Sequence, residues 1–187
     1  MASLKWPPKI HGLLPHDALW YLLVRKRADG IPLSMCDYSR FILLKEWAMW
    51  KECYLPPEGV KGATVLDVGA GCGESAYFYF QHGAKRVVAI EPNRECARNY
   101  RLNAQRNHWD TVLFERPFQL SDVTGLDFDM VKMDCEGGEE ALLPLQRLPR
   151  GTYEVHGRRL IALFKERFGA GAKWVRVNRK VSIMFNW

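Results

Sequence analysis

The chain has 187 residues, of which 48% are apolar and 26% are charged, and it carries a net charge of +6. This length predicts one domain with a buried core, and the composition excludes a disordered or collagen-like chain. The apolar run at 18–24 is too short to span a bilayer and no secretory signal pattern precedes it, so a cytoplasmic protein without a membrane anchor is expected.

Residues 1–61 are predicted to form an N-terminal helical cap. The pattern predicts one helix over 15–28 and a second over 37–54, with Asp37 as the N-cap of the second. The aromatic and apolar face of the second helix is more typical of packing than of a cofactor site. Prolines and glycines then break the helical pattern, and residues 62–187 are predicted to form the main domain, in one compact unit with the cap.

From residue 62 onward, strand patterns alternate with helix patterns, which is typical of a parallel sheet with right-handed crossovers. Strands are predicted over 64–68, 86–91, 111–115, 127–134 and 152–156, and helices over 74–82, 94–106 (capped by Asn93), 139–148 and 159–168. The tail predicts two further strands joined by a turn at 178–180, so one strand of the sheet is expected to be antiparallel. The predicted class is α/β.

A glycine-rich turn, DVGAGCGES at 67–75, follows the first predicted strand. A dinucleotide-binding turn needs G-x-G-x-x-G/A, but the sixth position here is Glu74, which would repel a pyrophosphate. A P-loop is excluded because no G-K-[ST] closes the turn. Glu91 ends the second strand, where a carboxylate can accept hydrogen bonds from both hydroxyls of a ribose. These features favour a ligand with a ribose, a cationic tail and no phosphate, and S-adenosylmethionine has this chemistry.

Two motifs carry a family resemblance. VLDVGAGCGE at 65–74 resembles the first motif of the class I S-adenosylmethionine-dependent methyltransferases, and VVAIEPN at 87–93 resembles their second. The resemblance implies a Rossmann-like seven-stranded sheet of order 3-2-1-4-5-7-6 with strand seven antiparallel, and S-adenosylhomocysteine as the product. It implies that the glycine turn approaches the methionine part of the cofactor, that Glu91 holds the ribose and that Gln119–Leu120 lie near adenine. The full set of implied cofactor-binding residues is Asp67, Gly69, Ala70, Gly71, Gly73, Glu91, Pro92, Gln119, Leu120 and Asp134.

The segment DFDMVKMDCEGGEEALL at 127–143 resembles the D-x-D/E-G-x-E segment of the FkbM-type methyltransferases. TYEVHG at 152–157 is similar to their E-x-H strand, and QLSD at 119–122 is similar to their turn before strand four. Members of that family mostly methylate hydroxyls of sugars and other small metabolites. The resemblance therefore implies an O-methyltransferase of a saccharide-like or other small hydroxylated acceptor.

Ionisable residues gather at the ends of the fourth and fifth predicted strands. Asp134 and Glu136 follow the fourth strand, while Glu154 and His156 share a face of the fifth. His156 is the predicted general base, because an ordinary imidazole pKa suits neutral pH. Asp134 is expected to orient the acceptor or meet the cofactor's amine, and Glu136 to bind acceptor hydroxyls. The alternative is a divalent metal held by Asp134, Glu136 and His156. Glu139 is expected only to complement the N-terminus of the next helix.

The five cysteines show neither a CxxC pair nor a zinc spacing, so reduced, buried thiols are expected at Cys36, Cys53, Cys72, Cys96 and Cys135.

Positive charge is concentrated in the last part of the chain. From residue 146 onward there are ten Lys/Arg and two Glu, an excess of eight over a whole-chain charge of +6. Such a surface could favour an anionic partner such as RNA. An RNA methyltransferase is therefore one alternative function. A second is a non-catalytic cofactor-binding protein that acts through a partner at its Trp-rich cap.

Overall fold

The computed structural model describes residues 31–187, so the helix predicted over 15–28 lies outside the described residues. The second predicted helix is present as α2 (Asp37–Tyr54). Asp37 is its first helical residue and not its N-cap, so that prediction is wrong by one position. The N-cap is Cys36, whose backbone is extended and whose carbonyl accepts a hydrogen bond from Arg40 N–H at 3.1 Å.

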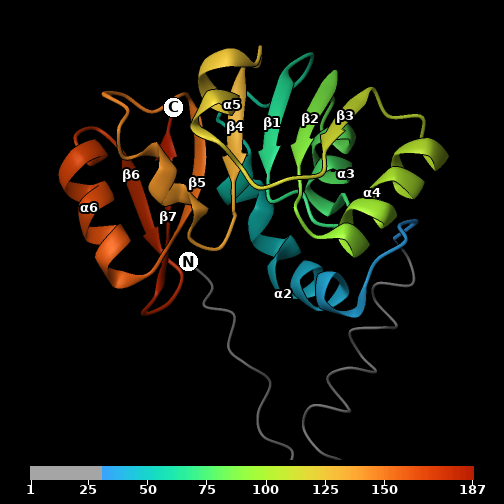
Figure 1. The fold of residues 1–187 in the computed structure, drawn as a ribbon, viewed down its shortest axis with the longest axis horizontal. Coiled ribbons are helices and arrows are strands. Elements are labelled where there is room, and N and C mark those ends of the chain that lie inside the picture. Colours follow the sequence, from blue (N-terminus) through green and yellow to red (C-terminus); the bar gives the residue numbers. More distant parts are fainter. Residues whose placement is uncertain (1–30) are drawn as a thin grey trace, which may run out of the picture.

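One sheet of seven strands forms the centre of the described region. Its strands are β1 (Thr64–Val68), β2 (Arg86–Ile90), β3 (Thr111–Phe114), β4 (Met130–Met133), β5 (Gly151–His156), β6 (Lys173–Arg176) and β7 (Val181–Asn186). They lie in the order β3-β2-β1-β4-β5-β7-β6 (Figure 1). β7 is antiparallel to both of its neighbours and the other pairs are parallel. The predicted order and the antiparallel strand are confirmed.

The register of the central strands brings three loop residues to the same point. Val68 of β1 pairs with Ile90 of β2 on one side and with Met133 of β4 on the other. The residues that directly follow β1, β2 and β4 are Gly69, Glu91 and Asp134, respectively. The chain runs from β1 outward to β3 and then returns to β4 on the other side of β1, so these residues meet at the switch point, where open α/β sheets bind ligands.

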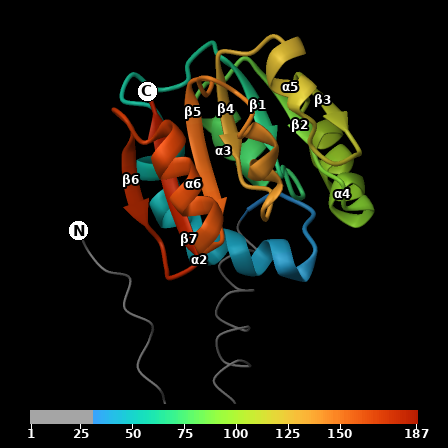
Figure 2. The same cartoon turned by 60° about the vertical axis from the view of Figure 1, so that its left-hand side comes forward.

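Helices cover both faces of the sheet. They are α2, α3 (Glu74–Gln81) and α4 (Arg94–Arg106) on one face, and α5 (Leu120–Gly125), the 3₁₀ helix η1 (Gly138–Leu142) and α6 (Arg158–Phe168) on the other. Along β1, Val65 packs into the core under the first group, whereas Leu66 and Val68 pack into the core under the second. Figure 2 shows α3 and α6 on opposite sides of the sheet. As predicted, Asn93 caps α4 by accepting hydrogen bonds from two backbone N–H groups.

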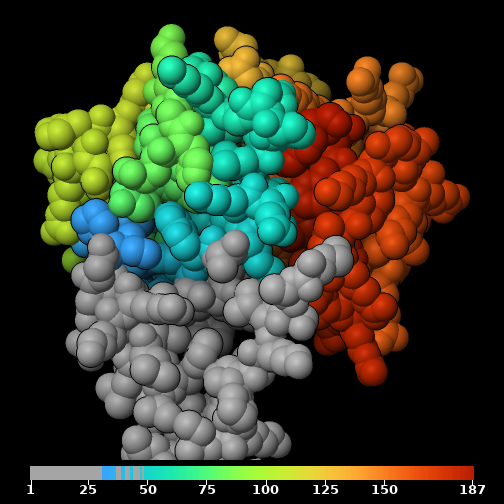
Figure 3. Space-filling view, turned by 180° about the vertical axis from the view of Figure 1, so that it is seen from behind, coloured from blue at the N-terminus to red at the C-terminus, as the bar shows by residue number. Residues whose placement is uncertain are grey.

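The described part of the N-terminal cap belongs to the same core as the sheet. Trp50 and Tyr54 of α2 are buried and lie against Phe78 of α3, with ring centroids 5.7 and 6.5 Å apart. Seen from behind, the surface that includes α2 (cyan) lies between the region of α4 (green) and the C-terminal strands (red) (Figure 3). In the described range 31–187, every helix is too short or too polar to cross a bilayer.

Three elements differ from the sequence predictions. β4 spans only Met130–Met133 and not 127–134. The helix predicted over 139–148 is only the short η1, because Pro144 lacks a backbone N–H and follows directly after the C-cap Leu143. The unpredicted helix α5 begins after Gln119, which forms a capping box with Asp122.

Candidate functional site

A cavity of about 330 Å³ opens at the carboxyl ends of β1, β2 and β4, a volume within the range of small-molecule sites. Its walls include eight of the residues that the family resemblance implies or that the strand patterns place at the acceptor end: Gly69, Ala70, Gly71, Glu91, Pro92, Asp134, Glu136 and Glu154. α2 supplies a further wall with Ser39, Leu43, Trp50 and Tyr54, none of which the sequence analysis assigned to the site. The N-terminal cap is therefore part of the cavity.

The glycine turn brings its backbone close to the chain that follows β4. Gly69 has a φ of +76°, and a Cβ built there would overlap the carbonyl oxygen of Asp134. A Cβ on Gly71 would lie 2.7 Å from Oε2 of Glu74, whose buried side chain also lines the cavity. Gly73 serves packing instead, because a Cβ there would press on the rings of Trp109 and Tyr100.

Glu91 holds the turn from the end of β2. Its Oε2 accepts a hydrogen bond from Gly71 N–H at 2.8 Å and its Oε1 accepts one from Asn93 N–H at 2.7 Å. Burial raises the pKa of the Glu91 carboxyl, although both N–H groups act in the opposite direction. Each carboxylate oxygen can accept a second hydrogen bond, so Glu91 still has acceptor capacity for a ribose diol in the cavity that it lines.

Asp67 lies beneath the cavity and does not line it. It is fully buried, accepts a hydrogen bond from Ser75 Oγ at 2.5 Å and lies 3.2 Å from Lys132 Nζ. Lys132 in turn donates to the carbonyl of Gly69 at 2.9 Å and lines the cavity. Burial lowers the pKa of Lys132, but the charges of Asp67 and Asp134 outweigh it and raise that pKa above its usual value. Asp67 therefore supports the glycine turn through a buried ion pair that the sequence analysis did not predict.

Gln119 and Leu120 are not among the residues that line the cavity. Gln119 is the N-cap of α5, where its backbone N–H donates to Asp122 at 2.7 Å, and Leu120 is the first residue of that helix.

At the acceptor end, one imidazole is surrounded by four carboxylates. His156 Nδ1 lies 3.0 Å from Oε1 of Glu139. Its Nε2 lies 3.6 to 3.7 Å from carboxylate oxygens of Asp134, Glu136 and Glu154. Three of these four carboxylates also line the cavity, and Glu139 is the one that does not. The predicted trio of Asp134, Glu136 and His156 is thus brought together by the fold.

The charge of this cluster corrects one prediction. Burial lowers the pKa of the His156 imidazole, but its hydrogen bond with Glu139 and the charges of Glu139, Asp134 and Glu154 raise that pKa to about 9. Burial also raises the pKa of the Asp134 carboxyl, although the positive charges of Lys132 and His156 act to lower it. The imidazole is therefore protonated at neutral pH, and the expectation of an ordinary pKa at His156 is wrong.

Glu139 has a larger role than the sequence analysis assigned to it. Its side chain is fully buried, and Oε1 accepts a hydrogen bond from Cys135 N–H at 3.2 Å as well as facing His156. Glu136 and Gly137 take positive φ values of +53° and +102°, which turns the chain and carries Glu139 back toward β5. Glu139 is the last residue of the D-x-D/E-G-x-E pattern, so the family resemblance held a signal for it that the assignment to the helix N-terminus did not use.

The alternative of a metal at the trio has some geometric support. One ligand atom each from Asp134, Glu136 and His156 lies within 4.8 Å of the other two. A cation that binds these residues displaces the proton from Nε2, so metal binding here competes with protonation of His156.

Comparisons with known proteins add to this geometry. No known family profile matches the chain. A 69-residue segment is 32% identical to the electron transfer flavoprotein beta subunit lysine methyltransferase of Xenopus laevis, and it covers 37% of this chain but only 28% of that protein. The Pyrococcus furiosus methyltransferase structure is similar with a TM-score of 0.60 and 17% identity, over 90% of this chain and 96% of that one. The 16S rRNA N2 G1207 methyltransferase of T. Thermophilus, solved with AdoMet and guanosine, has a TM-score of 0.53 and 21% identity, over 84% of this chain and 45% of that one.

None of these three carries an FkbM-type name, so that finer resemblance stays a prediction. Structural likeness at such low identity establishes architecture and not activity. With its strand order and antiparallel seventh strand, the chain has the fold of the class I S-adenosylmethionine-dependent methyltransferases.

Proposed function

We propose that the protein is an S-adenosylmethionine-dependent methyltransferase that acts on a hydroxyl of a small acceptor of the saccharide type. The observation that carries this proposal is the position of Asp134. It lines the cavity against the glycine turn, and its carboxylate also lies 3.7 Å from Nε2 of His156. Asp134 thus lies between the part of the cavity that suits a methyl donor and the His156 cluster, which suits an acceptor.

The residues around the cavity fit the parts of S-adenosylmethionine. Glu91 can accept hydrogen bonds from both ribose hydroxyls, and the carboxylates of Glu74 and Asp134 offer negative charge to the cationic methionyl end. When bound, the cofactor supplies an electrophilic methyl group. The close approach of Gly69 to Asp134 leaves no room for a side chain between donor and acceptor regions.

The acceptor end fits a hydroxylated molecule. An aliphatic hydroxyl needs a base to take its proton as the methyl group transfers. Glu136 and Glu154 line the cavity, lie 3.7 and 3.6 Å from Nε2 of His156, and can accept hydrogen bonds from sugar hydroxyls. His156 accepts the proton in its neutral form, which becomes the major form above pH 9.

Calorimetric titration tests the cofactor assignment directly. We expect S-adenosylmethionine and S-adenosylhomocysteine to bind with micromolar affinity and NAD not to bind, because the turn lacks the features that hold a pyrophosphate. Absence of binding of either sulfur-containing ligand to the folded protein would contradict the proposal. Binding without turnover on any acceptor would favour the non-catalytic alternative.

The Glu139–His156 pair predicts an alkaline activity profile. If neutral His156 is the base, kcat/KM should rise about tenfold per pH unit below the pKa and level off near pH 9. Glu139→Gln removes the charge that raises this pKa, so the midpoint should move to lower pH. The measurement is the pH profile of methyl transfer together with an NMR titration of the His156 ring, which needs no acceptor.

Glu140→Gln is the matched control, because Glu140 is exposed and adjacent in sequence. The pair also affects folding. A pKa raised in the folded state stabilises the fold below the unfolded pKa of about 6.5, and this contribution is lost as the pH rises through about 9. An unchanged ring titration in Glu139→Gln would show that Glu139 does not control His156.

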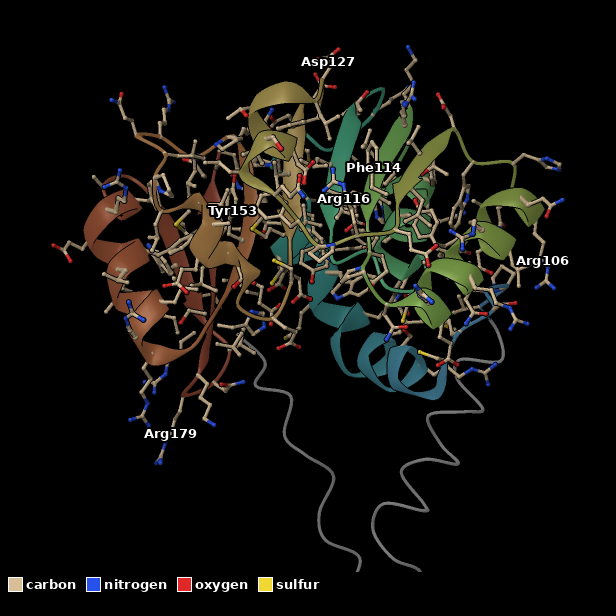
Figure 4. All side chains as sticks on the ribbon, in the orientation of Figure 1. Arg106, Phe114, Arg116, Asp127, Tyr153 and Arg179 are labelled. Atoms are coloured by element: carbon tan, nitrogen blue, oxygen red, sulfur yellow. The ribbon has the colours of Figure 1, made fainter. Side chains whose placement is uncertain are left out.

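A second candidate, RNA methylation, is favoured by the position of the basic C-terminal turn. Arg176, Arg179 and Lys180 are exposed, and Arg179 projects away from the body of the protein (Figure 4). The turn adjoins the acceptor end, because Gly157 N–H, next to His156, donates to the carbonyl of Lys180 at 2.6 Å. Positive charge therefore lies at the edge of the same site.

This candidate predicts that the RNA-binding constant falls as salt is added. The slope of its logarithm against the logarithm of the salt concentration should be about −0.7 for each phosphate contact on a single strand. The double variant Arg179→Ala/Lys180→Ala should lower that slope by about 1.4, whereas Arg94→Ala/Arg98→Ala on α4 should not. Filter binding across a salt series measures both. Weak binding that salt does not change would exclude the RNA alternative.

A further inference from the structure

Three cysteines from distant parts of the sequence meet beside the glycine turn. Cys36 precedes α2, Cys72 lies within the glycine turn and Cys96 lies in the first turn of α4. Cys36 Sγ is 3.8 Å from Cys72 Sγ and 3.9 Å from Cys96 Sγ, and all three sulfurs lie within 4.8 Å of one another. All three are free thiols, as expected, but Cys36 is only half-buried, which differs from the expectation of a buried thiol. Their linear spacing gives no sign that they converge.

The separations of the sulfur atoms fit a metal tripod. A tetrahedral zinc ion with Zn–S bonds of about 2.3 Å holds its sulfur ligands about 3.8 Å apart. A disulfide needs a bond of about 2.05 Å, and it would join two sulfurs and leave out the third. Thiolate ligands select soft cations such as Zn²⁺ over Mg²⁺ or Ca²⁺.

The surroundings of the tripod are already ordered. The buried Asn103 donates from Nδ2 to the carbonyls of Ser34 and Cys72, both at 2.8 Å, and accepts from Ser34 N–H at 2.7 Å. Its contacts fix the segment before α2 against the glycine turn. The sulfurs of Cys36 and Cys72 therefore come from two segments whose relative position is set without a metal.

An oxygen donor and negative charge lie next to the sulfurs. Cys36 Sγ donates to Ser39 Oγ at 3.4 Å, and both Ser39 and Cys96 line the cavity. Glu74 and Glu91 line it as well, and their carboxylates favour a cation in this region.

We propose that Cys36, Cys72 and Cys96 form a binding site for one Zn²⁺ ion, with the Ser39 hydroxyl or solvent from the cavity in the fourth position. The ion would join the segment before α2, the glycine turn and α4 at one point. This site does not depend on the proposed methyl transfer, and it is separate from the acidic cluster at His156.

The test uses the full chain, freed of metal with a chelator under reducing conditions and then titrated with Zn²⁺ and with Co²⁺. We expect one ion per chain, a rise in the melting temperature and, for Co²⁺, the near-ultraviolet absorption of thiolate-to-metal charge transfer. Cys36→Ser and Cys96→Ser should each lower the affinity by more than the roughly 10- to 100-fold that loss of an outer partner costs. The matched control is Cys53→Ser, which replaces another buried thiol.

Three outcomes would overturn the proposal: no Zn²⁺ bound by the reduced wild type, binding that survives both Cys36→Ser and Cys96→Ser, or binding that is lost in Asp134→Asn. If the cysteine variants do not fold, alkylation of the wild type decides the question. Zn²⁺ should then protect Cys36 and Cys96 from a thiol reagent and leave the rate at Cys135 unchanged, and equal rates with and without Zn²⁺ would overturn the site.

Discussion

Replacing His156 by alanine should lower the rate of methyl transfer by about 10²- to 10⁴-fold and leave the affinity for S-adenosylmethionine nearly unchanged. The two effects separate because His156 is not among the residues that line the cavity, whereas Asp134 and Glu136 are, and they lie 3.7 Å from its Nε2. Single-turnover transfer of a labelled methyl group to a hydroxylated acceptor measures the rate, and calorimetry with the cofactor measures the affinity.

His156→Asn separates chemistry from architecture. An asparagine amide can still donate a hydrogen bond to Glu139, but it cannot accept a proton as an imidazole does. If His156→Asn keeps the melting temperature and cofactor affinity yet loses activity, His156 acts on the acceptor. Full activity in His156→Asn would reject the role of general base and leave His156 as a residue that positions the carboxylates.

The second large effect is expected at the end of β2. Glu91→Ala should weaken S-adenosylmethionine binding by about 10- to 150-fold for each ribose hydrogen bond lost, because a hydrogen bond to a charged group contributes about 1.5–3 kcal/mol. The exposed Glu95 provides the control, since Glu95→Ala removes the same charge four residues later, in the first turn of α4. Calorimetry gives the affinities, and thermal unfolding without ligand shows how much of the change comes from the turn itself. Equal affinities in the wild type and a folded Glu91→Ala would refute the ribose assignment.

Much of the fold follows from local sequence patterns. β1, the glycine turn and α3 are recognisable because an apolar run, glycines with positive φ and a helical pattern follow one another within a short stretch. The helix predicted over 139–148 is longer than the observed η1. The apolar spacing in the sequence continues past Pro144, but helical hydrogen bonding does not. α5 was missed because its six residues contain few apolar positions and depend on a capping box.

The site was predictable where each residue follows directly from a strand. Gly69, Glu91 and Asp134 are each the first residue after a strand, so the sheet order alone brings them together. Lys132 had one signal that was not used, because it is a charged residue between the apolar residues of a strand. All four residues of that strand are buried. Glu139 also had a signal, as the last residue of the D-x-D/E-G-x-E pattern, but its contact with His156 depends on the turn at 136–137. The three converging cysteines had no signal, because their positions depend on how the segments pack in three dimensions. The raised pKa of His156 depends most on Glu139, whose contact with the ring was not predicted, and also on Asp134 and Glu154, which the strand patterns place at the same edge.

The hydrogen bonds of Glu91 have a consequence for how this protein could change. The same carboxylate accepts a hydrogen bond from Gly71 N–H and lines the cavity, so both the rigidity of the glycine turn and the ligand preference depend on Glu91. Any replacement that alters the ligand would also loosen the turn, and selection acting on either property would oppose it. If ligand preference changes during evolution, we therefore expect substitutions at Pro92 before substitutions at Glu91, because Pro92 is exposed and also lines the cavity.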